Sequence, residues 1–430
     1  MNDDELQVLG KRRKLSKREK WKLAILTIGF FSITALFGLG CYLYISPRQA
    51  DGREAWKEEG ESTIVPELQS AVDSLLNAEL TEIDGLQGQA IVMEVQTGEI
   101  LAMVGLERNF EGKLQPCKNF AYQQELGSTA QTAALLAALE TGKVELSDTV
   151  DTGNGIWPVD NERYMRDHNW ERGGYGMITF DRALEVSSNI GISKAVRRAF
   201  GNDAQGFLNQ LEKMSYGQPD SIEGIDGLRP TVYSSPKDRD WANWLVCWHA
   251  IGYERLMAPI QMLTFYNAIA NDGKMVKPTL ITKAETEVIN PHIASGKNIK
   301  LIQETLDHVV SQGLGAKAGI TLLSVAGKTA TSQIKKYYDF GDAAVCEYQV
   351  GFCGYFPADA PKFSIIVSMN KLGLPASGGG MAGVVFHYIM KWMIAHGMPN
   401  TLMVDEETND TIRISPENVD SITKAYSEGL

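Results

Sequence analysis

Cysteine and histidine are scarce in this sequence, and neither residue is arranged for metal or disulfide chemistry. The 430 residues include five cysteines and six histidines, with no CxxC pair and no HExxH motif. A disulfide scaffold and a zinc enzyme therefore have little support. Basic residues are also in deficit, because 41 Lys and Arg against 53 Asp and Glu give a net charge of −12. An acidic chain argues against a nucleic-acid binder, which needs a basic face.

Recognisable cofactor motifs are missing as well. Gly378-Gly379-Gly380 is not followed by the Lys and Ser/Thr of a phosphate-binding loop. We expect no cofactor and no metal. With 44% hydrophobic residues the chain is too apolar to be disordered.

The one long apolar run, residues 23–45, has 23 residues without a charge. As a helix it would span roughly 35 Å, enough to cross a hydrocarbon core of about 30 Å. Residues 1–22 hold eight basic and four acidic residues, whereas 46–66 hold three and five. The positive-inside rule then predicts a single-pass anchor in the inner (cytoplasmic) membrane, with a cytoplasmic N-terminus and a periplasmic main domain. A cleaved signal peptide is the alternative, but its apolar core should be shorter.

Beyond the anchor, the sequence suggests a polar linker at 46–60, a folded domain at 61–396 and a polar, acidic tail at 397–430. Hydrophobic periodicity predicts the elements of the domain. Helices are expected at Pro66–Leu80, Ser128–Leu139, Phe180–Phe200, Pro259–Ala270 and Val384–His396, and strands at Ala90–Val95, Glu99–Val104, Ser324–Thr331, Gln349–Phe356 and Phe363–Met369. Strands early and late with helices between them indicate an α/β (α+β) fold in which an antiparallel sheet packs on helices.

Three short segments fit the design of one serine enzyme. Ser128 stands where a loop enters a helix, and Gln131 follows three residues later. Ser187-Ser188-Asn189 forms an SxN tripeptide, and Lys328-Thr329-Ala330-Thr331 lies on a predicted strand. The order and contexts match the SxxK, SxN and KTG motifs of penicillin-binding proteins and β-lactamases.

With these motifs the chain resembles the transpeptidase domain of class B penicillin-binding proteins, closest to the cell-division type. The resemblance covers about residues 61–396 and includes GQAIVMEVQTGEILAMVG and IGYERLMAPIQMLTFYNAIANDGKMVKP. It implies a five-stranded sheet flanked by helices, an all-helical lobe, and an active-site serine between them. It also implies a role in peptidoglycan synthesis or cell division, with stem peptides, β-lactams and membrane-embedded division proteins as partners. The short linker leaves no room for the family's large non-catalytic pedestal.

The resemblance implies a role for each matched residue. Ser128 would be the nucleophile, and Ser187, Asn189 and Lys328 would complete the catalytic group. Thr329 would hold the substrate carboxylate, and the N–H groups of Ser128 and Thr331 would form the oxyanion hole.

Two departures put the reaction in doubt. The family's lysine, which takes the proton of the serine, is Gln131, and an amide cannot act as a base. The KTG glycine is Ala330, at a type of strand position where glycine usually permits close approach.

Loss of the base lowers turnover by about 10⁴–10⁶ in related serine constellations. We therefore expect a transpeptidase fold in which transpeptidation is impaired, a pseudoenzyme that binds peptides or partners. One alternative is an active D,D-transpeptidase with Lys328 as surrogate base. A second is a β-lactam sensor that acylates once.

Simpler interpretations stay open for the same residues. Ser128 could be a helix N-cap, and the SxN pair and Lys328 could serve structure alone. Outside the membrane, Cys117, Cys247, Cys346 and Cys353 would meet an oxidising compartment, so a disulfide among them is an open question.

Overall fold

A six-stranded antiparallel sheet forms the centre of the computed structural model, which describes residues 61–398 except 284, 322 and 340–343. The strand order is β12-β13-β14-β1-β2-β3, and every neighbouring pair runs antiparallel. The strands are β1 (Gly85–Glu94), β2 (Ile100–Arg108), β3 (Leu114–Pro116), β12 (Ala326–Asp339), β13 (Ala344–Phe356) and β14 (Phe363–Leu372). The five strands expected from sequence are present and longer than expected. The short β3, which was not expected, extends the sheet beyond β2.

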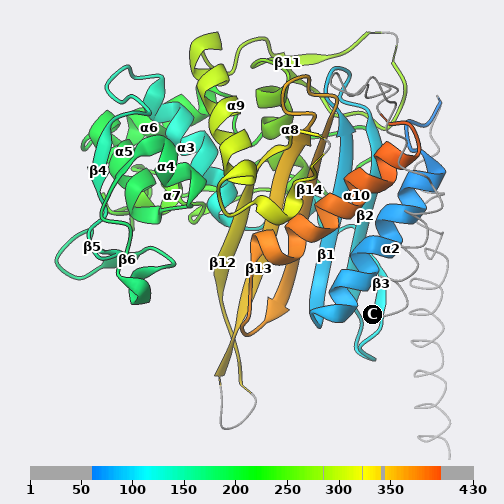
Figure 1. Cartoon of the computed structure of the whole chain (residues 1–430), viewed down its shortest axis with the longest axis horizontal. Coiled ribbons are helices and arrows are strands. Elements are labelled where there is room, and N and C mark those ends of the chain that lie inside the picture. Colours follow the sequence, from blue (N-terminus) through cyan, green and yellow to red (C-terminus); the bar gives the residue numbers. More distant parts are fainter. Residues whose placement is uncertain (1–60, 284, 322, 340–343, 399–430) are drawn as a thin grey trace, which may run out of the picture. The chain divides into compact units, whose positions relative to one another are not determined.

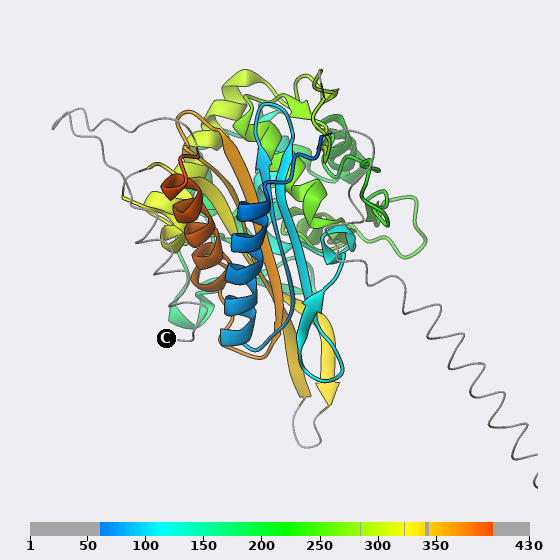
Figure 2. The same cartoon turned by 90° about the vertical axis from the view of Figure 1, so that its right-hand side faces the viewer.

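Helices cover both faces of the sheet (Figures 1 and 2). On one face α2 (Pro66–Glu82) and α10 (Gly383–Ala395) lie side by side and share a buried core with Ala90 and Val92 of β1. The alternate residues of β1, such as Ile91, are equally buried and point to the other face. There α8 (Pro259–Ala270) packs, and all twelve of its residues are buried. The sheet is therefore buried on both faces.

A helical lobe lies beside β12 and occupies the left of Figure 1. Its helices are α3 (Ala130–Leu139), α4 (Phe180–Glu185), α5 (Asn189–Phe200), α6 (Ala204–Lys213) and α7 (Leu245–Ala250). Its short strands pair as β4 (Thr149–Asp151) with β7 (Met177–Thr179) and β5 (Ile156–Pro158) with β6 (Tyr164–Arg166). The remaining elements are β8 (Val232–Tyr233), between α6 and α7, and β9 (Arg255–Leu256), β10 (Met275–Val276), β11 (Val288–Asn290) and α9 (Gly296–Ser311), which lie between α7 and β12 in the chain.

The sequence prediction of one helix over Phe180–Phe200 is wrong. The chain forms two helices, α4 and α5, with a break between Glu185 and Asn189. Ser187 in the break has φ of +55°, a left-handed backbone conformation that is incompatible with a regular right-handed α-helix. The break falls on the SxN tripeptide, so the local departure from helical periodicity coincides with the expected site. The predicted helix Pro259–Ala270 has the bounds expected.

Several sequence predictions concern residues outside those described. The apolar run 23–45, the linker 46–60 and nearly all of the tail 397–430 belong to this group. Within the described part of the chain, no helix combines the length and the hydropathy that crossing a bilayer requires. The four cysteines of the described part, Cys117, Cys247, Cys346 and Cys353, are all free thiols, which answers the open disulfide question.

Candidate active site

Ser128 lies in a tight turn pressed against the edge strand of the sheet. The turn, η4 (Gly127–Thr129), leads directly into α3. Gly127 has φ of +56°, and a Cβ there would come within 1.7 Å of the Ser332 hydroxyl on β12. Only glycine fits this contact. The Ser128 side chain is half-buried, makes no helix-capping bond, and has no hydrogen-bond partner among the described residues. The N-cap interpretation of Ser128 is therefore wrong.

A second segment supports the serine turn from another side. A Cβ on Gly252 would lie 1.9 Å from the carbonyl oxygen of Gly127. The Glu254 backbone N–H donates to the Glu125 carboxylate at 2.9 Å. Gln124 and Met257 exchange backbone hydrogen bonds. The turn is thus held between β12 and the segment that precedes α8.

Gln131 sits at the centre of a polar network that joins two of the three motifs. The Ser187 hydroxyl donates to Gln131 Oε1 at 3.1 Å, and Gln131 Nε2 donates to Asn189 Oδ1 at 2.9 Å. Asn189 Nδ2 in turn donates to the Arg166 carbonyl at 3.0 Å. Gln131 is fully buried, so its amide must have partners on both sides, and it has them.

The strained backbone at Ser187 is held by its neighbours. Ser188 caps α5 by accepting from the Gly191 N–H at 2.9 Å, and its hydroxyl donates to Asp167 at 2.7 Å. Asp167 also accepts from the Ile190 N–H at 3.0 Å. Burial raises the pKa of Asp167, while these hydrogen bonds oppose that shift. Sequence reasoning missed Asp167, because a lone acid in an irregular segment has no periodic signal.

Lys328 completes the network from the sheet. Its Nζ donates to the Ser187 hydroxyl at 2.8 Å and to the Thr329 carbonyl at 3.0 Å. The side chain is fully buried, and no acidic group of the described chain forms an ion pair with it. Burial without a counter-ion lowers the pKa of Lys328 to about 7. The amine is therefore partly neutral at physiological pH.

The methyl group of Ala330 is accommodated beneath the strand. Ala330 is buried and pairs with Gly351 of β13. Its Cβ lies 3.6 Å from the position that a Cβ on Gly351 would take and 3.7 Å from the equivalent position on Gly127. The methyl group fills space that Gly351 and Gly127 leave because they have no side chain. Alanine therefore fits at this position without displacing the serine turn.

The two threonines of the third motif have different partners. Thr331 Oγ1 accepts from the Gly378 N–H at 2.9 Å, where the glycine-rich π-turn before α10 crosses β12. A Cβ on Gly378 would be 2.2 Å from the Ala330 carbonyl, which explains a glycine at that position. No described residue hydrogen-bonds to the Thr329 hydroxyl. The hydroxyls of Ser128 and Thr329, which the resemblance assigns to the substrate, are the ones left without partners in the described chain.

His168 and Tyr175 lie beside the network and were also missed by sequence reasoning. Tyr175 Oη and His168 Nε2 are 3.1 Å apart, and Tyr175 donates to the Val186 carbonyl at 3.5 Å. Burial, Arg172 and Lys328 together lower the pKa of His168. The imidazole is thus close enough to Lys328 to respond to its charge.

The structure therefore brings Gln131, Ser187, Asn189 and Lys328 into one hydrogen-bonded group beside the Ser128 turn. Among the described residues no set of His, Cys, Asp or Glu side chains is grouped to hold a metal. The arrangement resembles an acyl-transfer site in which the residue one helical turn after the serine can exchange hydrogen bonds but cannot take a proton.

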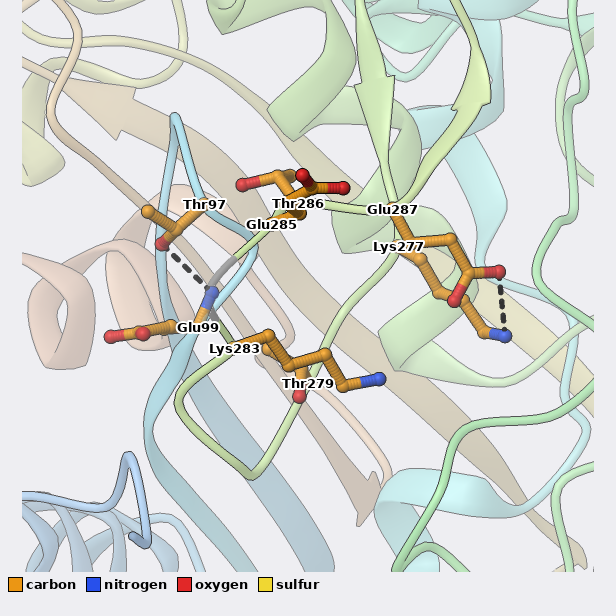
Figure 3. Close-up of a pocket in the computed structure, with 8 residues that line it drawn as sticks. All are labelled: Thr97, Glu99, Lys277, Thr279, Lys283, Glu285, Thr286 and Glu287. Carbon is orange, nitrogen blue, oxygen red and sulfur yellow. Dashed lines mark hydrogen bonds and ion pairs between the residues drawn. The ribbon is translucent and has the colours of Figure 1, made fainter. Parts of the chain in front are cut away.

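A small polar pocket lies elsewhere, between the β1–β2 turn and residues 277–287 (Figure 3). Thr97 Oγ1 accepts there from the Glu99 N–H at 3.2 Å, and Lys277 pairs with Glu287 at 2.9 Å. Its volume of about 10 Å³ is about the smallest that can hold one water molecule. The pocket shares no residue with the Ser128 network.

The model of the penicillin binding protein transpeptidase domain matches residues 88–391, which include the serine turn, the SxN break and β12. The chain belongs to this family. Its relatives include the peptidoglycan D,D-transpeptidase FtsI of Buchnera aphidicola, 26% identical over 77% of this chain and 57% of the relative. The Escherichia coli FtsI is 25% identical over 75% of this chain and 54% of its own length. Stage V sporulation protein D of Bacillus subtilis is 26% identical over 79% of this chain and 55% of the relative.

Solved structures agree on the fold. The transpeptidase domain of Burkholderia pseudomallei penicillin-binding protein 3 superposes with a TM-score of 0.64, at 23% identity, over 77% of this chain and 94% of that domain. The resemblance to class B penicillin-binding proteins inferred from the motifs is thereby confirmed. The chain spans a little over half the length of its named relatives.

Proposed function

We propose that this chain is a membrane-anchored, periplasmic transpeptidase-like protein of peptidoglycan synthesis or cell division that binds stem peptides but transfers acyl groups poorly or not at all. The observation that carries the proposal is the Gln131 amide, fully buried and hydrogen-bonded to Ser187 and Asn189. It fills the position of the family's base with a group that cannot be protonated near neutral pH.

The rest of the site supports retained binding. Gln131 reproduces the hydrogen bonds of a neutral amine, because it accepts from Ser187 and donates to Asn189. Lys328 and Thr329 stay on β12 beside the serine turn. A buried cation and an unpartnered hydroxyl suit a carboxylate ligand, such as that of a peptide terminus or a β-lactam.

The expected deficit in rate is large. General-base catalysis contributes about 10²–10⁴ to proton transfer, and loss of one member of a serine–base group lowers turnover by about 10⁴–10⁶. A typical turnover of about 10 s⁻¹ would fall to about 10⁻³ s⁻¹ or less. That rate is too slow to build a wall within a generation, which favours a binding role.

The test is complementation with a variant that lacks the nucleophile. In cells deprived of the native chain, Ser128→Ala should restore any growth or division phenotype as fully as wild type. Thr329→Val with Lys328→Met, which removes the carboxylate-binding groups, should not. Purified Ser128→Ala should also bind a stem-peptide analogue as tightly as wild type in calorimetry. Failure of Ser128→Ala to complement, despite normal abundance, would refute the binding role.

One observation favours an active enzyme as second candidate. Lys328 has a pKa of about 7 and contacts the Ser187 hydroxyl at 2.8 Å, so a neutral Lys328 could accept a proton relayed through Ser187. In the structure the Ser187 hydroxyl donates to Gln131, so the relay requires that hydroxyl to turn. If Lys328 is the base, acylation by a β-lactam should rise through pH 7 and be absent from Lys328→Met.

A further inference from the structure

The Glu125 carboxylate, three residues before Ser128, holds a backbone group of a segment that is distant in the chain. The side chain is half-buried, and its Oε1 accepts from the Glu254 N–H at 2.9 Å across a separation of 129 residues. Glu254 has φ of +63°, a left-handed conformation that is rare for a glutamate. Such a conformation persists only where its surroundings hold it, and a hydrogen bond to a carboxylate is one of the stronger means of doing so.

The segment that Glu125 holds runs antiparallel to the serine turn and touches it. Gln124 and Met257 exchange backbone hydrogen bonds at 3.0 and 3.1 Å. Two residues beyond Glu125, a Cβ on Gly252 would come within 1.9 Å of the Gly127 carbonyl oxygen, so the two backbones are in direct contact. Of these three contacts, the one at Glu125 is made by a side chain, and a substitution can therefore remove it alone.

Strand β12 confines the serine turn from the opposite side. A Cβ on Gly127 would lie 1.7 Å from Ser332 Oγ, so no space is left between turn and strand. Ser332 directly follows Thr331, whose N–H the resemblance pairs with that of Ser128 as an oxyanion hole. Donors in such a site must be held to within about 0.5 Å. The position of Ser128 relative to Thr331 thus depends on how firmly the turn is held against β12.

Tyr253 connects the same segment to β12. Burial raises the pKa of Tyr253, the backbone of Gln333 on β12 opposes that rise, and Glu125 adds to it. The contacts therefore form a closed ring, which passes from the serine turn through Glu125 to Tyr253 and returns through β12 to the turn. Because the ring is closed, loss of the Glu125 hydrogen bond should loosen the turn as well as residue 254.

We propose that Glu125 is a positioning residue for Ser128, because its carboxylate holds residues 252–257 against the serine turn and so fixes Ser128 relative to Thr331. The inference rests on the proposed function, since it concerns how a ligand meets the same serine. It requires nothing of Gln131 and applies whether or not the site has lost its base. A purely structural role for Glu125 predicts a different result, in which its loss destabilises the whole chain evenly.

The test is hydrogen exchange of the full chain in detergent, read by mass spectrometry of its peptides. In Glu125→Ala, peptides covering 124–130 and 250–257 should exchange about tenfold faster or more, because a hydrogen bond to a charged group is lost. Glu125→Gln keeps an acceptor oxygen at the same reach and should restore most of the protection. Glu140→Ala is the matched control, because Glu140 also accepts a backbone N–H, from Ser295 at 3.0 Å, at the far end of α3. It should leave exchange at 124–130 unchanged.

Glu125→Asp keeps the test valid if Glu125→Ala does not fold, because it retains the charge and is one methylene too short to reach Glu254. Calorimetry with a stem-peptide analogue gives the functional readout. Its affinity should fall about tenfold or more in Glu125→Asp and recover in Glu125→Gln.

Two results would overturn the proposal. One is unchanged exchange at 124–130 in both Glu125→Ala and Glu125→Asp, and the other is faster exchange there with unchanged peptide affinity. A wild-type chain that binds no stem peptide would refute the proposed function instead. The exchange pattern then decides this inference, since local loosening that Glu125→Gln reverses supports it and even loosening of the whole chain overturns it.

Discussion

Two buried cations in this molecule have opposite surroundings. Lys328 lies among groups that accept hydrogen bonds from it, because the Ser187 hydroxyl and the Thr329 carbonyl both accept from its Nζ. Arg255 is also buried, yet two of its nitrogens have no hydrogen-bond partner in the described chain. Neither cation forms an ion pair with an acid among the described residues, although Glu212 lies near enough to raise the pKa of Arg255. A lysine can relieve this situation by losing its proton, whereas an arginine cannot.

The difference separates what each site is able to do. Burial lowers the pKa of Lys328 to about 7, so the charge of this side chain changes with pH near neutrality. Burial of Arg255 cannot be relieved in that way, and its charge is instead favoured by the rings of Tyr216 and Tyr233 and by Glu212. Gln131 belongs to the same network as Lys328. A neutral amide there avoids the electrostatic repulsion that a second amine would add to this buried network.

Replacement of Lys328 by arginine should give the largest effect on stability. Lys328→Arg introduces a larger group that cannot lose its charge into a fully buried site, so we expect a loss of about 3 kcal/mol or more in unfolding free energy at pH 7. Lys328→Met removes the charge and should cost less. Urea unfolding of both variants measures the difference. A Lys328→Arg variant as stable as Lys328→Met would show that the site tolerates a permanent charge.

Restoring an amine at position 131 should give the next largest effect. Gln131→Lys supplies a base beside Ser128, and we expect its acylation by a fluorescent β-lactam to be at least about 100-fold faster than that of wild type. The neighbouring Lys328 should lower the pKa of the new amine, so the rate should rise with pH at or below neutrality. Gln131→Met, of similar length but without a base, is the control and should show no gain.

The pH dependence of stability should carry the signature of Lys328. Its folded pKa of about 7 lies below the unfolded value of 10.5, so between these values the unfolded chain holds one more proton than the folded chain. Stability from this group therefore rises with pH from about 7 upward, by up to about 1.4 kcal/mol per pH unit, and is lowest below pH 7. Subtracting the unfolding curve of Lys328→Met over pH 6.5–9 isolates it. A difference that is flat with pH would mean that Lys328 titrates normally.

The smallest effect is expected at Trp241, and it contrasts with the effect at Gln131. Trp241→Phe removes a donor that has no partner among the described residues and should change stability by less than about 0.5 kcal/mol. Gln131→Leu leaves the Ser187 hydroxyl without its acceptor and the Asn189 side-chain oxygen without its donor. It should lower the free energy of unfolding by about 2–3 kcal/mol. Chemical unfolding of the two variants side by side tests whether satisfied and orphaned groups differ as the structure indicates.

Sequence patterns predicted the architecture better than the chemistry. The helix Pro259–Ala270 followed from a mostly apolar segment in which single polar residues recur every third position, and the order of the three motifs was enough to indicate the family. The break at Ser187 was missed although Ser187, Ser188 and Asn189 are residue types that favour helix caps, and Ser188 caps α5. Asp167, 20 residues away in the chain, holds the turn in place, and no local pattern indicates that contact. The pKa of Lys328 and the orphaned edge of Arg255 depend on which groups surround them in three dimensions, and a sequence does not give distances.

We propose that this site keeps its groups for binding but has lost its base. The most direct test is the intact mass of the full chain after prolonged incubation with excess β-lactam at pH 7, beside Ser128→Ala and Gln131→Lys. We expect one covalent adduct on Gln131→Lys, none or a trace after many hours on wild type, and none on Ser128→Ala. An adduct that forms on wild type as fast as on Gln131→Lys, and is absent from Ser128→Ala, would contradict it and identify an active enzyme with another base.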